Sequence, residues 1–155
     1  MDKKALSERD ISTKYITPAL KSSGWDIKTQ IREEVSFTAG KIFVRGKLVQ
    51  RGKQKRADYI LYYKPHLPIA IIEAKDNNHT LSAGIQQALD YSNDLDIPFV
   101  YSSNGDGFLE HDKTKSESIE TELSLESFPS PEELWSRYSL WKNLDNEKEK
   151  IVTQD

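Results

Sequence analysis

The chain has 155 residues, a formal net charge of −3, 36% hydrophobic and 30% charged residues, and no cysteine. This length predicts one domain with a core of its own, and the lack of cysteine excludes disulfides and thiolate metal sites in this sequence. No stretch is apolar for long enough to span a bilayer and no apolar signal segment follows the N-terminal residues, so a cytoplasmic location without membrane attachment is expected.

The first third of the chain is expected to form helical turns and then three short strands. Ser7 is a typical N-cap for a first helix. Pro18 cannot continue that helix comfortably, so Thr17 is expected to cap a second helix that has Pro18 at its first position and ends near Gly24. Strands are expected near residues 35–38, 41–44 and 47–50.

Two β-branched and aromatic runs, residues 57–63 and 69–75, are expected to pair as a hairpin. The five residues between them include two prolines and cannot continue either strand, so the chain must turn about His66 and Leu67. We expect this hairpin near the centre of a mixed sheet, with helices packed on the faces of that sheet.

Three charged side chains converge on one face of the predicted hairpin. Asp58 falls roughly opposite Lys75, and Glu73 shares a face with Lys75 because it lies two residues away on the same strand. The same face is expected to continue into the core through three isoleucines, Ile60, Ile69 and Ile71.

Two carboxylates and one lysine at this spacing suit a metal-dependent nuclease. A hard cation such as Mg²⁺ prefers oxygen ligands and keeps several waters, and it lowers the pKa of a bound water beside a phosphate. Lysine adds a point charge that can orient the water or bind the phosphate. The alternative is a charged rim on an ordinary hairpin. The apolar run that precedes Glu73 argues against it, because charge placed there costs stability unless something compensates.

A helix over about residues 81–94 is expected after this hairpin, capped by the polar residues 76–80. Gln87 and Tyr91 lie four residues apart and therefore share a stripe of that helix. They are either a pair that assists the site or a surface glutamine with a half-buried tyrosine. A strand over 98–102 and a second hairpin follow.

The C-terminal part is expected to hold a helix that starts at a capping box at Ser130, with Pro131 at its first position. Trp135, Tyr138 and Trp141 lie on that helix. They either fold back on the core or form an interface with another domain.

A basic stretch precedes Asp58. Six Lys or Arg residues lie between positions 45 and 56 without one acidic residue, and they are Arg45, Lys47, Arg51, Lys53, Lys55 and Arg56. Such a stretch draws in phosphate and predicts DNA binding. The alternative is a solvated hairpin tip.

The pattern of Asp58 followed by Glu73, Ala74 and Lys75 resembles the PD-(D/E)xK nuclease motif, and the chain from about residue 7 to 140 resembles the N-terminal nuclease domain of the R (restriction) subunit of type I restriction-modification enzymes. The blocks that carry this resemblance are residues 14–20, 24–25, 57–63, 68–79, 87–91, 98–100, 103–108 and 128–135. The resemblance implies an α/β restriction-endonuclease-like core, with a mixed central sheet flanked by helices, and Mg²⁺-dependent cleavage of double-stranded DNA in which Mn²⁺ can substitute.

The resemblance also implies roles for individual residues. Asp58, Glu73 and Lys75 would be catalytic. The metal ligands would be Asp58, Glu73, the carbonyl of Ala74 and Glu8, with Glu34 as the competitor of Glu8. Gln87 and Tyr91 would be accessory, and the DNA-binding residues would be Arg51, Lys53, Lys55 and Arg56.

The expected nuclease domain covers residues 1–140, and residues 141–155 form a charged helix or linker toward a motor domain. This sequence contains no Gly-x-x-x-x-Gly-Lys-Ser/Thr motif, so ATP would serve only the full-length subunit, as the resemblance implies. That subunit would act with modification (M) and specificity (S) subunits. Two rival functions are a DNA-binding or assembly module that does not cleave, and a stand-alone nuclease.

Overall fold

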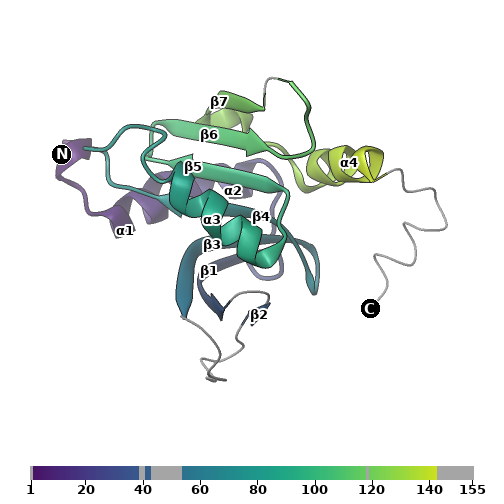
Figure 1. The fold of residues 1–155 in the computed structure, drawn as a ribbon. Coiled ribbons are helices and arrows are strands. Elements are labelled where there is room, and N and C mark those ends of the chain that lie inside the picture. The colour runs from purple at the N-terminus through teal and green to yellow at the C-terminus, as the bar shows by residue number, and fades with distance from the viewer. Residues whose placement is uncertain (1, 39–40, 43–53, 118, 143–155) are drawn as a thin grey trace.

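The computed structural model describes residues 2–38, 41–42, 54–117 and 119–142, and it places them in one mixed seven-stranded sheet with helices on both faces (Figure 1). The strands are β1 (Ile31–Thr38), β2 (Lys41–Ile42), β3 (Lys55–Lys64), β4 (Leu67–Ala74), β5 (Phe99–Ser103), β6 (Gly107–Asp112) and β7 (Glu120–Ser124). Their order in space is β2-β1-β3-β4-β5-β6-β7, and β4 pairs with β5 in parallel while the other neighbours are antiparallel. The predicted fold class is therefore confirmed, with the β3–β4 hairpin near the centre of the sheet.

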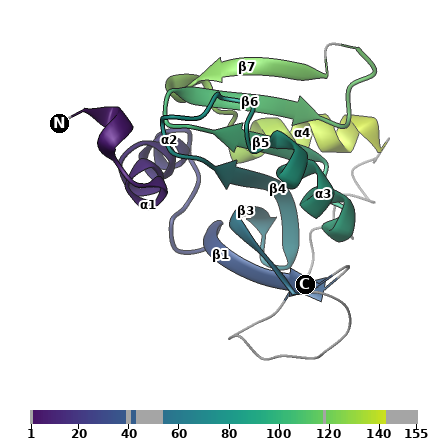
Figure 2. The ribbon, with the colours of Figure 1, turned by 60° about the vertical axis from the view of Figure 1, so that its left-hand side comes forward.

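The helices cover the sheet from two sides (Figures 1 and 2). They are η1 (Lys3–Ala5), α1 (Glu8–Ile11), the π-helical turn η2 (Ser12–Ile16), α2 (Thr17–Ser22), α3 (Ile85–Leu95), η3 (Leu125–Ser127) and α4 (Pro131–Trp141). The larger apolar core lies between the sheet, the N-terminal helices and α4, and it includes Ile16, Leu61 and Leu134. The smaller core lies between the sheet and α3, and it includes Ile60 and Ala88. In the described ranges, no helix has the length and hydropathy of a membrane span.

The N-terminal helices form one continuous run from Glu8 to Ser22 instead of two capped helices. Ser7 caps the run as predicted, by accepting a hydrogen bond from the Asp10 N–H. The prediction that Thr17 caps a second helix was wrong, because its backbone is helical and its hydroxyl bonds to the Tyr59 hydroxyl at 2.8 Å. The π-helical turn carries the chain into Pro18, since the Thr17 N–H bonds five residues back to the Ser12 carbonyl.

The hairpin of β3 and β4 turns one residue earlier than predicted. Lys64 pairs with Leu67, so the two-residue loop is Pro65–His66, and His66 has a positive φ of 66°. Proline before a residue with positive φ is the preferred sequence of a type II turn. The regular pairs are therefore shifted by two residues from the prediction, a shift that by itself keeps a side chain on its predicted face.

The isoleucines of the hairpin are divided between the two cores. Ile60 and Ile71 are buried together in the smaller core against α3, so their prediction as core residues of one face is confirmed. Ile69 packs in the larger core instead, so that part of the prediction was wrong. Ile69 lies beside the irregular pairing between Leu61 and Lys64, where simple alternation of faces does not hold.

Helix α3 begins at Ile85, four residues later than predicted. Residues 80–84 form turns instead, because the Leu81 carbonyl accepts a hydrogen bond from the Ser102 hydroxyl at 2.6 Å and the Ile85 N–H bonds to Ser82. The strand expected near 35–38 is confirmed as part of β1, and the one expected near 41–44 is confirmed over the two residues of β2. The strand expected at 47–50 lies outside the described residues.

Candidate metal and nuclease site

Asp58 and Glu73 lie together where β3 and β4 stop pairing through their backbones. The last regular pair there is Tyr59 with Ile72. Beyond it, the carboxylate of Glu73 accepts a hydrogen bond from the Asp58 N–H at 2.9 Å, and the carboxylate of Asp58 accepts one from the Ala74 N–H at 2.8 Å. Each bond uses one oxygen of its carboxylate, and a carboxylate has further lone pairs for another ligand.

The environment of this pair disfavours two negative charges. Burial, followed by the charge of Asp58, raises the pKa of Glu73 to about 8. Burial also raises the pKa of Asp58. The positive charge of Lys75 offsets part of this increase in the pKa of both carboxyls, so its ammonium group acts on the same patch. Glu73 is buried and Asp58 is half-buried, and two such carboxyls that repel each other form a place where a cation relieves the cost of ionisation.

The backbone around the pair comes from three elements. Lys75 follows β4 directly, and its N–H donates to the Ser103 carbonyl of β5 at 2.9 Å. Gly84, just before α3, packs against Glu73 so closely that an added Cβ would lie 3.3 Å from the Glu73 Cβ. A side chain at position 84 would therefore require Glu73 or the start of α3 to shift by a few tenths of an ångström.

The raised pKa of Glu73 predicts that the protein without bound metal loses stability as the pH rises. The unfolded carboxyl titrates near its ordinary value of 4.5, whereas the folded one titrates at about 8. Between these values the folded state holds a proton that the unfolded chain has released, so this contribution to stability is complete below the lower value and is lost as the pH rises through the higher one. Urea unfolding in EDTA across this range measures the slope.

The variant Glu73→Gln should lack this pH-dependent component, because glutamine resembles the protonated acid at every pH. Glu132→Gln, on the exposed start of α4, is the matched control and should keep it. Equal pH profiles for Glu73→Gln and Glu132→Gln would contradict the raised pKa.

Glu8 and Glu34, the two candidates for an additional acidic ligand, both lie near Asp58. A cavity of about 180 Å³ has Glu8, Glu34 and Asp58 in its wall. Burial and the charge of Asp58 raise the pKa of Glu8. Both carboxylate oxygens of Glu34 already face arginines, Arg9 and Arg56, which favours Glu8. Among the residues that the structure describes, no three acidic or histidine side chains meet closely enough to form a ready metal site.

Gln87 and Tyr91 are joined as their spacing predicted. The Gln87 amide donates to the Tyr91 hydroxyl at 2.6 Å, and the Tyr91 ring packs edge-on against Phe37 at 5.0 Å. Gln87 is exposed to solvent on the first turn of α3. Their role as accessory residues stays a prediction.

The predicted DNA-binding residues divide into two groups. Arg51 and Lys53 lie outside the described residues. Lys55 bonds to Asp94 of α3 at 2.6 Å, so it ties β3 to α3, and Arg56 lies in the wall of the cavity beside Asp58. Arg9 was not predicted as a neighbour of this site, because α1 reaches β1 only through the packing of the helices on the sheet.

A family model described as "Type I restriction enzyme R protein N terminus" matches residues 27–129. The chain belongs to this family. The carboxylate pair, Lys75 and the Gln87–Tyr91 pair all lie within the matched range.

Two proteins that are similar to this chain have names that agree with this family. The chain is 47% identical over 152 residues to the type I restriction enzyme EcoAI endonuclease subunit of Escherichia coli, covering 97% of this chain and 19% of that protein. It is also similar to a solved fragment assigned to the HsdR subunit of a type I restriction enzyme of Vibrio vulnificus, with a TM-score of 0.70 and 39% identity, covering 92% of this chain and 27% of that one. The chain thus spans about a fifth of the length of the curated relative.

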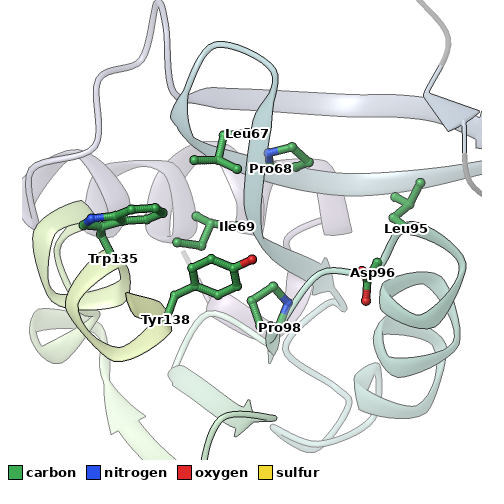
Figure 3. A pocket seen from close by; sticks show the side chains of 8 residues that line it. All are labelled: Leu67, Pro68, Ile69, Leu95, Asp96, Pro98, Trp135 and Tyr138. Atoms are coloured by element: carbon green, nitrogen blue, oxygen red, sulfur yellow. The ribbon is translucent and has the colours of Figure 1, made fainter. Parts of the chain in front are cut away.

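The R-protein N-terminal domain has a second, mostly apolar cavity of about 200 Å³ beside α4 (Figure 3). Trp135 and Tyr138 of α4 face Ile69 and Pro98 across it. Trp135 stacks on Tyr63 with ring centroids 4.7 Å apart. Trp135 and Tyr138 therefore fold back on the core, whereas Trp141 is 46% exposed. The expected division into residues 1–140 and 141–155 stays a prediction, since residues 143–155 lie outside the described part.

Proposed function

We propose that this chain is the metal-dependent endodeoxyribonuclease domain of a type I restriction enzyme R subunit. The observation that carries the proposal is the pair of adjoining carboxyls, buried Glu73 and half-buried Asp58, with the charge of Lys75 acting on both. The family supports it, and so does the relative that is named an endonuclease subunit.

The residues present fit a divalent cation, Mg²⁺ or Mn²⁺. The fit rests on the oxygen donors that Asp58 and Glu73 place side by side, each with lone pairs beyond its one backbone hydrogen bond. The raised pKa values of both carboxyls mean that their ionisation is unfavourable without a cation nearby. Asp58, Glu73, the carbonyl of Ala74 and Glu8 would hold the ion. When bound, the ion would activate water and stabilise negative charge on the phosphate.

The other groups of this chain would prepare the DNA and the water. Lys75 would orient the attacking water and take part in moving its proton. Gln87 and Tyr91, joined to each other on α3, would support the site or the DNA. The basic residues Arg51, Lys53, Lys55 and Arg56 would follow the DNA backbone.

A second candidate function is a DNA-binding or assembly module that does not cleave. One observation favours it: the carboxylates of Asp58 and Glu73 bond to backbone N–H groups and so help to join β3 to β4, which is a structural role. A stand-alone nuclease is a weaker rival. In the full-length subunit, ATP and the modification and specificity subunits would complete the enzyme.

The test is whether the purified chain binds a divalent metal and nicks DNA only when that metal is present. Calorimetry with Mn²⁺ should show binding, and supercoiled plasmid should be nicked weakly and without sequence preference in Mg²⁺ but not in EDTA. No ATP hydrolysis is expected. DNA binding without metal binding would favour the non-cleaving module, and efficient cutting at one defined sequence without ATP would favour the stand-alone nuclease.

A further inference from the structure

Two arginines from different elements meet one carboxylate beside Asp58. Arg9 of α1 has a guanidinium nitrogen 3.0 Å from Oε2 of Glu34, and Arg56 of β3 has one 3.5 Å from Oε1 of the same residue. Arg9 also lies 3.2 Å from Glu33. The arginine side chains are 63% and 66% exposed, so solvent and large ligands can reach both.

Glu34 holds this position at a conformational cost. Its φ is +52°, in the left-handed region that disfavours residues with a Cβ. The pairs Glu33–Tyr59 and Val35–Ala57 on either side place it opposite Asp58 in the β1–β3 register. Strained backbone of this kind persists where the surrounding structure requires it, and it is concentrated at binding and catalytic sites.

The cavity beside Asp58 gives the two arginines a common space. Its wall contains Arg9, Arg56, Glu34 and Asp58, together with Glu8, Ser12 and Glu33. A carboxylate held between two guanidinium groups presents one negative charge and two oxygen acceptors, as a backbone phosphate does, and arginine N–H groups donate to both kinds of anion.

We propose that Arg9 and Arg56 form a phosphate-binding pair for the DNA backbone beside Asp58, and that Glu34 occupies this pair in the protein without DNA. The inference rests on the proposed function for the identity of the ligand. A backbone phosphate displaces the Glu34 carboxylate and places the DNA next to the carboxyls of Asp58 and Glu73. The exchange is feasible because exposed ion pairs are weak, whereas DNA binding gains from the release of counterions.

The first part of the test measures affinity for a short DNA duplex by fluorescence anisotropy in EDTA, at several salt concentrations. Arg9→Gln and Arg56→Gln should each weaken binding and reduce the slope of log affinity against log salt by about one unit. Arg32→Gln, an exposed arginine of β1 outside the cavity wall, is the matched control and should keep the slope. Unchanged slopes for both cavity variants would overturn the inference.

The second part tests the competition. Glu34→Gln should tighten DNA binding about two- to fivefold, the range expected for removing an exposed ion pair. Glu132→Gln makes the same change of charge on α4 and controls for the general electrostatic effect. In the Arg9→Gln/Arg56→Gln background, Glu34→Gln should behave like Glu132→Gln, because the residues it competes for are gone. Tightening that survives in this background would contradict the proposed exchange.

These outcomes are separate from the outcome of the proposed function. If the arginine variants lose affinity while the chain neither binds metal nor nicks DNA, the phosphate pair stands and the nuclease proposal fails. If the chain nicks DNA in a metal-dependent way and the arginine variants bind as wild type, the nuclease proposal stands and the phosphate pair fails.

Discussion

Asp58→Asn and Glu73→Gln should each lower the rate of metal-dependent DNA nicking by on the order of 100-fold or more, because a bound metal supplies several kcal/mol of transition-state stabilisation. Each variant keeps an oxygen that can accept the cross-strand N–H of Ala74 or Asp58. Both variants also remove one of two charges that repel each other. They should therefore fold with wild-type or higher melting temperatures while losing Mn²⁺ binding in calorimetry.

Two further variants sharpen this prediction. The double variant Asp58→Asn/Glu73→Gln should nick no more slowly than either single one, because residues that act as one unit are not additive. Lys75→Ala should lose nicking and keep Mn²⁺ binding, since an ammonium group is no metal ligand. Glu132→Gln serves as the control. Wild-type nicking by Glu73→Gln would remove the carboxylate pair from the proposed mechanism.

Arg137→Met should destabilise the fold by about 3–5 kcal/mol, the cost of breaking a buried ion pair on one side only. Arg137 reaches from α4 to two buried carboxylates of β6, at 3.1 Å from Glu110 and 3.2 Å from Asp112. Those carboxylates are 1% and 0% exposed, respectively. The Tyr101 hydroxyl donates to Glu110 at 2.7 Å but carries no positive charge, so it cannot replace the arginine.

The control for Arg137→Met is a variant of another residue on the same helix. Glu133 bonds to Arg137 at 2.8 Å but is about half exposed, so Glu133→Ala should cost roughly 0.5 kcal/mol or less. Urea unfolding at neutral pH measures both. The prediction is wrong if Arg137→Met lowers the free energy of unfolding by less than about 1 kcal/mol and Glu133→Ala has an equally small effect. Glu110 and Asp112 of β6 would then not need the positive charge of Arg137.

The alternation of side chains along a strand was enough to predict that Asp58, Glu73 and Lys75 share a patch. The exact register was wrong by two residues, because the turn is at Pro65–His66, but a shift of two keeps Asp58 and Glu73 on one face. Local spacing also predicted the contact between Gln87 and Tyr91, since a helix brings residues four apart together. Local patterns thus predicted the carboxylate patch and the Gln87–Tyr91 contact, and the resemblance to the nuclease domain implied the fold class.

Contacts between distant segments could not be predicted in this way. Arg9, Glu34 and Arg56 meet because the helices that begin at Glu8 pack against the sheet, and no periodicity in the sequence encodes that packing. The same holds for the ion pairs of Arg137 with β6. It also holds for Ser102, whose hydroxyl donates a hydrogen bond to the Leu81 carbonyl, so that α3 begins later than predicted. The raised pKa of Glu73 also depends on burial. Residue types and their spacing determined which groups could do chemistry, whereas the packing of helices on the sheet determined their partners and charge states, because burial and long-range contacts exist only in the folded chain.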